Sequence, residues 1–113
     1  MIEIFHNPRC SKSRAGLQYL SDNNIEYIIV DYLKEGISAW EIKELANKIG
    51  CAAIDIVRTH EDFYKKELKG KNISEDDWYK IIAENPKLLH RPIMVNGTKA
   101  VFAQPADKVK EII

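Results

Sequence analysis

Apolar residues fall into short runs near both ends of the chain and into helical spacing between them. The runs at residues 2–5 and 27–30 predict two buried strands, and residues 11–23 predict a helix between the strands. Three positions of this helix are expected to be buried: Ala15, Leu17 and Leu20. A strand, a helix and a strand within about 30 residues predict a βαβ unit whose strands pair in parallel.

The middle of the chain is predicted to be helical. Ser38 and Glu41 form a capping-box pattern, and Gly50 is expected to end the helix that they begin. The apolar residues between them have helical spacing: Ile42, Leu45, Ala46 and Ile49. A short helix is expected at residues 51–57, and another begins after Ser74.

The last third of the chain changes character. Apolar runs at residues 92–95 and 99–102 flank Asn96-Gly97, which is a strong signal for a β-hairpin. Pro105 then starts a final helix. Its expected apolar stripe consists of Val109, Ile112 and Ile113. The order is therefore β-α-β, a helical block, a β-hairpin and a helix, which makes the fold class α/β.

Composition limits the classes of protein to which the chain can belong. The chain has 113 residues, enough for one domain with its own core. Lys plus Arg and Asp plus Glu each number 17, so no overall positive field points to nucleic acid. No apolar run is long enough to span a membrane, and no secretory signal is visible. Two cysteines, Cys10 and Cys51, make no disulfide framework, so we expect a reducing, cytoplasmic setting. The sequence leaves the oligomeric state open, with a monomer favoured.

Cys10 is the first candidate for chemistry. It lies where the first strand passes into the start of a helix, and helix N-terminal N–H groups favour a thiolate. Arg9, Lys12 and Arg14 add positive charge nearby, and His6 lies four residues upstream. The sequence therefore predicts a reactive thiol, with the alternative that Cys10 is a small buried apolar residue.

Three motifs carry a resemblance to a known family. Residues 6–14 (HNPRCSKSR) are similar to the active-site segment of the glutaredoxin-coupled arsenate reductase (ArsC) family. Residues 57–64 (VRTHEDFY) resemble its arginine-containing helical insert, and residues 85–93 (NPKLLHRPI) the segment that enters its third strand. The resemblance implies a thioredoxin-like fold, β-α-β plus β-β-α, in one domain with a helical insertion at about 38–85.

The same resemblance implies roles for particular residues. Cys10 would attack arsenic as the nucleophile, while Arg58 and Arg91 would hold the oxygens of the oxyanion, as guanidinium groups do well. The Arg91–Pro92 bond is implied to be cis, with the proline facing the thiol. N–H groups around residues 11–13 would add an anion nest.

Three further residues at the start of the helix are included in the candidate site. Ser11 and Lys12 supply N–H groups toward the anion, and Ser13 places a hydroxyl one helical turn from the thiol, where the family has a serine. His6 either tunes the thiol or only shapes the turn. No metal site is expected, since no His and Cys pair has ligand spacing.

The expected partners follow from the single thiol. Glutathione would act as co-substrate and glutaredoxin would resolve the resulting mixed disulfide, with no tightly bound cofactor.

Gln104 departs from the family pattern. The arsenate reductases proper carry a third arginine before the proline of the last helix, where this chain has Gln104 before Pro105. Gln104 is kept as a candidate substrate-binding residue, because its amide can hydrogen-bond an oxygen of the substrate or the glutathione backbone, but it supplies no charge. Losing one of three cations from a desolvated oxyanion site costs on the order of 1.5–3 kcal/mol. A glutathione-linked reductase of another substrate is therefore one alternative.

A second alternative is a non-enzymatic regulator. Spx-type transcriptional regulators resemble this family, bind RNA polymerase and sense oxidation through a Cys-x-x-Cys pair. Position 13 here is Ser13, so that pair is missing. A reductase of the low-molecular-weight tyrosine-phosphatase type is also excluded. Its active-site loop has the pattern Cys-x₅-Arg, which would need an arginine where this chain has Gly16.

Overall fold

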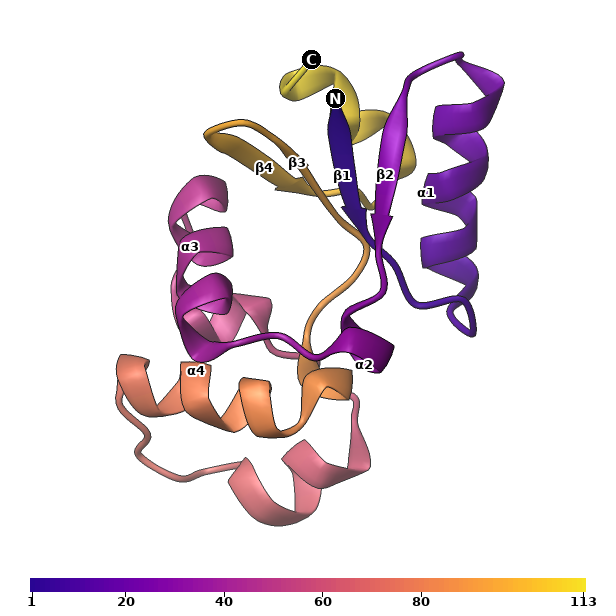
Figure 1. Ribbon diagram of the computed structural model, residues 1–113. Helices are drawn as coiled ribbons and strands as arrows, with labels where there is room; N and C mark the ends of the chain where they lie inside the picture. The colour runs from indigo at the N-terminus through magenta and orange to yellow at the C-terminus, as the bar shows by residue number, and fades with distance from the viewer. The chain divides into compact units, whose positions relative to one another are not determined.

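The computed structural model describes residues 1–113, and the chain forms two compact units (Figure 1). The first unit joins both ends of the chain, Met1–Glu35 and Arg91–Ile113. The second is the continuous segment Gly36–His90, which contains the predicted helical block. No helix in either unit has the length and apolar character needed to cross a bilayer.

A four-stranded sheet organises the first unit, with strand order β2-β1-β3-β4. Its strands are β1 (Ile2–Phe5), β2 (Tyr27–Val30), β3 (Ile93–Asn96) and β4 (Lys99–Phe102). The β1 and β2 strands pair in parallel, whereas β3 is antiparallel to both β1 and β4. The predicted parallel βαβ unit and C-terminal hairpin are confirmed.

The register of the sheet brings three distant chain segments to one end. Phe5 pairs with Ile93, and Ile93 pairs with Phe102 on its other side. The loop after β1, the residues before β3 and the residues after β4 therefore leave the sheet at the same end. Each of these segments carries a residue of the predicted site.

One face of the sheet packs against α1 (Ser11–Asp22) and the 3₁₀ helix η4 (Ala106–Glu111). The buried residues of this layer form one cluster: Ile2, Ile4, Leu20, Met94, Ala103, Val109 and Ile112. Gly16 brings α1 close to the sheet, since a Cβ there would lie 3.1 Å from Met94 Cε and 3.2 Å from Pro92 Cγ. A larger side chain would push α1 away from the segment that leads into β3.

Some predicted core positions of the first unit are wrong. Ala15 is exposed, because Gly16 and Leu20 face the sheet instead. Ile28 and Ile29 are 52% and 45% exposed, since β2 is an edge strand rather than a central one. Ile113 follows η4 and is also exposed.

The hairpin differs in detail from its sequence signal. Asn96 is the last residue of β3 and pairs with Lys99, so the two-residue loop is Gly97-Thr98. Gly97 has φ +63°, which suits the first central position of a type II′ turn. The Asn96 side chain instead donates to the Ile112 carbonyl at 2.7 Å and ties η4 to the sheet.

The helix α2 (Tyr32–Glu35), a single turn after β2, was not predicted. Tyr32 is fully buried, and its ring lies 6.5 Å from that of Phe5, centre to centre. Burial of this ring explains why a segment without helical periodicity folds back at this point.

The second unit is built on α3 (Ala39–Ile49) and α4 (Glu75–Glu84), which pack together. The capping box at Ser38 is present in both directions, and Gly50 ends α3 in the left-handed conformation, as predicted. Short turns complete the unit: 3₁₀ helices η1 (Ala53–Ile56) and η3 (Pro86–Leu88), and a π-helical turn η2 (Tyr64–Leu68).

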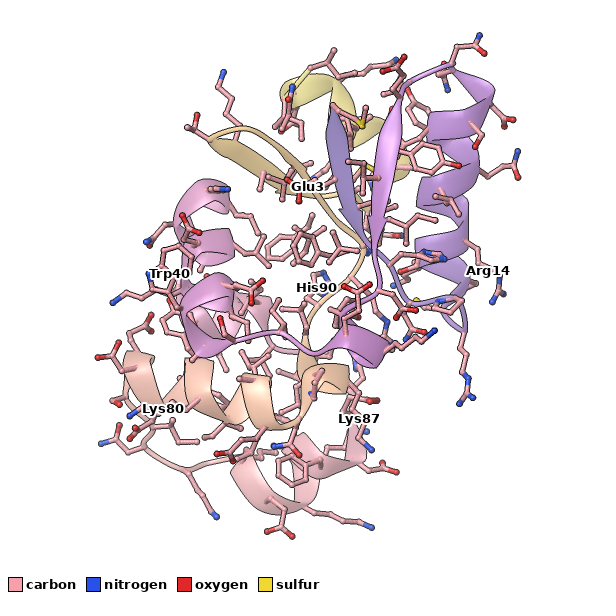
Figure 2. All side chains as sticks on the ribbon, viewed as in Figure 1. Glu3, Arg14, Trp40, Lys80, Lys87 and His90 are labelled. Atoms are coloured by element: carbon pink, nitrogen blue, oxygen red, sulfur yellow. The ribbon has the colours of Figure 1, made fainter.

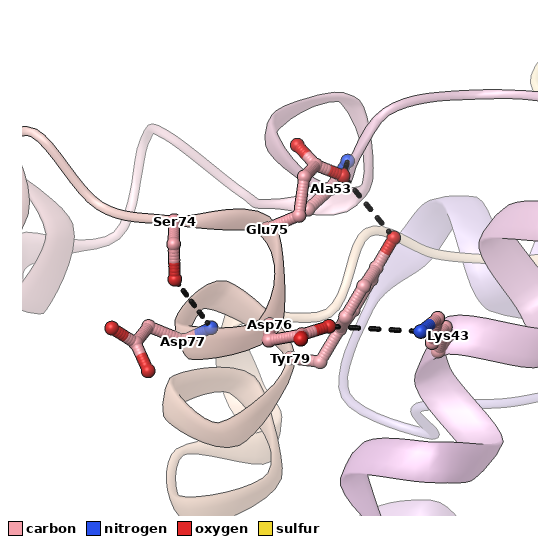
Figure 3. Close-up of polar contacts among 7 residues, drawn as sticks. All are labelled: Lys43, Ala53, Ser74, Glu75, Asp76, Asp77 and Tyr79. Carbon is pink, nitrogen blue, oxygen red and sulfur yellow. Dashed lines mark hydrogen bonds and ion pairs between the residues drawn. The ribbon is translucent and has the colours of Figure 1, made fainter.

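Polar contacts hold the start of α4 in place (Figure 3). The Ser74 hydroxyl accepts from the Asp77 N–H at 3.2 Å, as an N-cap does. Glu75 accepts from the Ala53 N–H at 3.1 Å and from the Tyr79 hydroxyl at 3.4 Å. Contacts with Glu75 therefore join η1 to α4 within the second unit.

Candidate active site

Cys10 is the N-cap residue of α1, in an extended conformation, and is partly exposed. The loop before it is a tight turn, in which the Cys10 N–H donates to the Asn7 carbonyl at 3.0 Å. Asn at the first position and Pro8 at the second are the residues that such a turn favours. The thiol is thus presented at the helix start by a defined turn, as the sequence predicted.

Ser13 lies inside the first turn of α1 and is fully buried. Its Oγ accepts a hydrogen bond from the Asn7 N–H at 3.3 Å, which joins the loop to the helix. Because that contact uses a lone pair of the oxygen, the hydroxyl proton stays available to donate to another group.

The pKa of the Cys10 thiol is lowered from its ordinary value. Burial acts to raise it, but the backbone N–H groups of Ser13 and Lys12 and the Arg91 guanidinium together outweigh burial. The donors at the helix start and the guanidinium all stabilise the thiolate form. The site therefore favours a nucleophilic sulfur.

Arg91 and Pro92 approach this thiol from the segment before β3. Arg91 is a buried arginine, and the bond between it and Pro92 is cis, which confirms the implied geometry. The Pro92 ring lies beside Gly16 of α1, where an added Cβ would be 3.2 Å from Pro92 Cγ, and the Pro92 carbonyl accepts from the Ala103 N–H at 2.9 Å. These contacts fix the segment beside the start of α1.

Gln104 follows β4 at the same end of the sheet. Gln104 is exposed, and its backbone N–H donates to the Phe102 carbonyl at 2.9 Å. The structure thus brings Arg91, Pro92 and Gln104 to the end of the first unit at which the Cys10 loop lies.

His6 is buried directly after β1, and its Nδ1 has no hydrogen-bond partner. Burial lowers the pKa of its imidazole, against the raising effect of the Asp31 carboxylate. The lowered pKa favours the neutral form of the ring, which supplies less positive charge to the thiolate than a protonated imidazole would.

The cations nearest to Cys10 in sequence lie on the outside. Arg9 and Lys12 are exposed, and so is Ser11. Arg14 lies on the outer side of α1 (Figure 2) and is exposed, and its guanidinium donates to the Pro8 carbonyl at 2.9 Å. Lys12 acts on the thiol through its backbone N–H rather than its ammonium group.

Arg58 belongs to the second unit. The Arg58 guanidinium lies 3.5 Å from the Glu61 carboxylate, and the backbone N–H of Arg58 donates to the Leu88 carbonyl at 2.7 Å. Cys51 lies in the same unit, and its pKa is raised by burial and by the carboxylates of Asp55 and Glu75. The pKa values of the two cysteines are therefore shifted in opposite directions.

Sequence reasoning missed two features of the site. Arg91 was expected to hold an oxyanion, yet it also acts on the thiol itself. Asn7 makes three hydrogen bonds in the loop, and only its place before a proline hinted at this. No group of three or more His, Cys, Asp or Glu side chains is arranged to hold a metal ion.

The fold and the loop define a class: a thioredoxin-like α/β protein with one activated cysteine after the first strand. The ArsC family model matches residues 5–112, and the chain belongs to the ArsC family.

Full-length relatives agree with this assignment. An arsenate reductase of Neisseria meningitidis serogroup A is 39% identical over 99% of this chain and 97% of its own. The solved structure of an arsenate reductase from Vibrio cholerae superposes with a TM-score of 0.93 at 35% identity, covering 99% and 97% of the two chains. The transcriptional regulator Spx of Staphylococcus aureus is more distant, at 25% identity over 100% of this chain and 87% of its own.

Proposed function

We propose that this protein is an arsenate-reductase-like oxidoreductase that reduces arsenate or a similar oxyanion through Cys10. The observation that carries the proposal is a lowered thiol pKa beside a buried guanidinium, that of Arg91. Relatives at 39% and 38% identity that are named arsenate reductases support the same reaction class.

The first step would be attack of the Cys10 thiolate on arsenic. An S–As bond forms while an As–O bond breaks, and the departing oxygen leaves as water after protonation. Arg91, and Arg58 as the resemblance implies, would hold oxygens of the oxyanion, and the N–H groups of Lys12 and Ser13 would add neutral donors. Ser13 would use its free proton to hold the thiolate.

The second step needs an external reductant. Reduction of As(V) to As(III) takes two electrons, which two thiols supply by forming one disulfide. The loop holds no second cysteine, since position 13 is serine. Glutathione would supply a thiol, and glutaredoxin would reduce the disulfide that results.

Gln104 favours a second candidate, a glutathione-linked reductase of another substrate. Its exposed amide stands at the end of the sheet where Cys10 and Arg91 meet, and it carries no charge. A less anionic substrate than arsenate needs fewer cations. The regulator alternative is disfavoured by Ser13, because a dithiol switch within the loop cannot form.

A coupled assay tests the proposal. Arsenate, glutathione, glutaredoxin and glutathione reductase are mixed with wild-type protein, Cys10→Ser or Cys51→Ser, and NADPH consumption is followed. We expect turnover in the wild type and in Cys51→Ser, and none in Cys10→Ser or without glutathione. Turnover that survives Cys10→Ser would contradict the mechanism.

The same assay with Gln104→Arg tests whether arsenate is the natural substrate. If arsenate is natural to this site, the added charge changes the rate by less than about tenfold. A gain on the order of ten- to a hundredfold would point to another substrate, because one desolvated cation contributes that much affinity.

A further inference from the structure

The loop that presents Cys10 is organised around one residue that the proposed reaction does not use. Asn7 is 7% exposed, although it lies in a surface turn. A buried amide side chain needs hydrogen-bond partners, and this one lies between β1 and the thiol.

Asn7 makes three hydrogen bonds that together span the loop. Its Oδ1 accepts from the Arg9 N–H at 3.0 Å, and its carbonyl accepts from the Cys10 N–H at 3.0 Å. Its own N–H donates to Ser13 Oγ at 3.3 Å. The side chain therefore fixes the turn from inside, while the main chain ties the turn to the cysteine and to the first turn of α1.

These bonds bear on the direction of the N–H groups at the helix start. The thiolate is stabilised by the N–H groups of Lys12 and Ser13, whose direction relative to Sγ depends on how the turn enters α1. Without the Oδ1 contact, Arg9 and the rest of the turn gain conformational freedom. Cys10 would then sample positions in which Sγ is farther from those donors.

We infer that Asn7 is a positioning residue, whose side-chain amide holds Cys10 where the helix-start N–H groups can stabilise its thiolate. The inference goes beyond the proposed function, because it concerns the acidity of the thiol and needs no particular substrate. Asparagine suits the role since it is neutral: a carboxylate here would accept the same bond but place negative charge near the thiolate.

The inference is tested by titrating the thiolate of Cys10 through its ultraviolet absorbance, in a Cys51→Ser background. Asn7→Ala is compared with Asn7→Ser, whose hydroxyl can form the same kind of turn more weakly. We expect the titration midpoint to rise in Asn7→Ala, with about a threefold or greater loss of thiolate near neutral pH. Asn7→Ser should lie between Asn7→Ala and the wild type.

Ser38→Ala is the matched control, because it removes a helix cap in the second unit and costs stability without touching the loop. Its midpoint should equal that of the wild type. An unchanged midpoint in Asn7→Ala, or no rescue by serine, would overturn the inference. Because the titration contains no substrate, failure of arsenate turnover would leave this result unaffected.

Discussion

Cys10 and Cys51 show how surroundings alone separate two chemically identical side chains. Helix-start N–H groups and Arg91 favour the Cys10 thiolate over the opposing effect of burial. Burial and two carboxylates disfavour the Cys51 thiolate. Burial raises the pKa of both thiols, so burial alone does not separate them. Nearby hydrogen-bond donors and charges make Cys10 the reactive one.

These opposite shifts predict opposite dependences of stability on pH. Because the folded pKa of Cys10 is lowered, its stabilising contribution is complete above the unfolded pKa, about 8.5, and is lost as pH falls through the folded pKa. The unfolding free energy of wild type minus Cys10→Ser should therefore rise with pH. For Cys51 the folded pKa is raised, so wild type minus Cys51→Ser should fall above about pH 8.5.

Urea denaturation at several pH values measures both differences. Parallel slopes for the two variants would contradict the assigned acidities.

Arg91 is predicted to tune the thiol as well as to bind an anion. Replacing it by glutamine removes a charge-assisted hydrogen bond, so alkylation of Cys10 by iodoacetamide near neutral pH should slow by about tenfold. Arg9→Gln is the matched control, because Arg9 is exposed and its side chain does not act on the thiol. Equal slowing in both variants would mean that loss of positive charge in general, not Arg91 itself, is responsible.

The residues of the site were predictable in different degrees. Cys10 could be identified from its place between a strand and a helix start. The neighbouring cations Arg9 and Arg14 were expected to add positive charge near the thiol, but both are exposed and neither acts on it, because closeness in sequence does not tell where a side chain points. Arg91 acts through a long-range contact, which depends on the register of β1 and β3 and could be inferred only from a family resemblance.

At the scale of elements, α1 depends on one small residue to reach the sheet. A side chain at Gly16 would meet Met94 and Pro92, whereas Ala15 beside it is exposed. Gly16→Val should lower the unfolding free energy by about 1–3 kcal/mol through overpacking, even though valine is a better helix former than glycine. Because Pro92 follows Arg91, the variant should also slow Cys10 alkylation.

Ala15→Val isolates the packing effect. It places the same β-branched side chain in the same helix, facing solvent, and should cost only about 0.5 kcal/mol of helix propensity. Chemical denaturation of the two variants gives the comparison. Equal losses would show that the approach of α1 to Pro92 is not tight.

Elements with local signals were predicted well. The Ser38 and Ser74 caps, the Gly50 terminus and the hairpin follow from interactions between residues close in sequence. The exposed edge position of β2 was missed, because an apolar run does not reveal which strand lies at the border of a sheet. Single turns such as α2 also escaped, since burial of Tyr32 rather than periodicity holds that turn.

At the scale of the molecule, the chain is stabilised without covalent cross-links. Both cysteines are free, and the formal net charge is zero. The midpoint of thermal unfolding should therefore be the same with and without a reducing agent, and two thiols should react per unfolded chain. A midpoint that falls on reduction would reveal a disulfide and contradict reliance on an external thiol.

The first unit gathers Cys10, Arg91, Pro92 and Gln104 from both ends of the chain. The chemistry of the thiol is thus complete only when the C-terminal segment pairs with β1. Sequence order alone does not show that these residues lie together, although the predicted βαβ unit and hairpin implied one shared sheet.

The central claim is that the fold activates Cys10 and leaves Cys51 inert. Its most direct test is competitive alkylation of the native wild-type protein with limiting iodoacetamide at about pH 6.5, with each site quantified by peptide mass spectrometry. We predict that Cys10 is modified at least tenfold faster than Cys51, and that the difference disappears in urea. Equal and slow modification of the two cysteines in the folded protein would contradict the account.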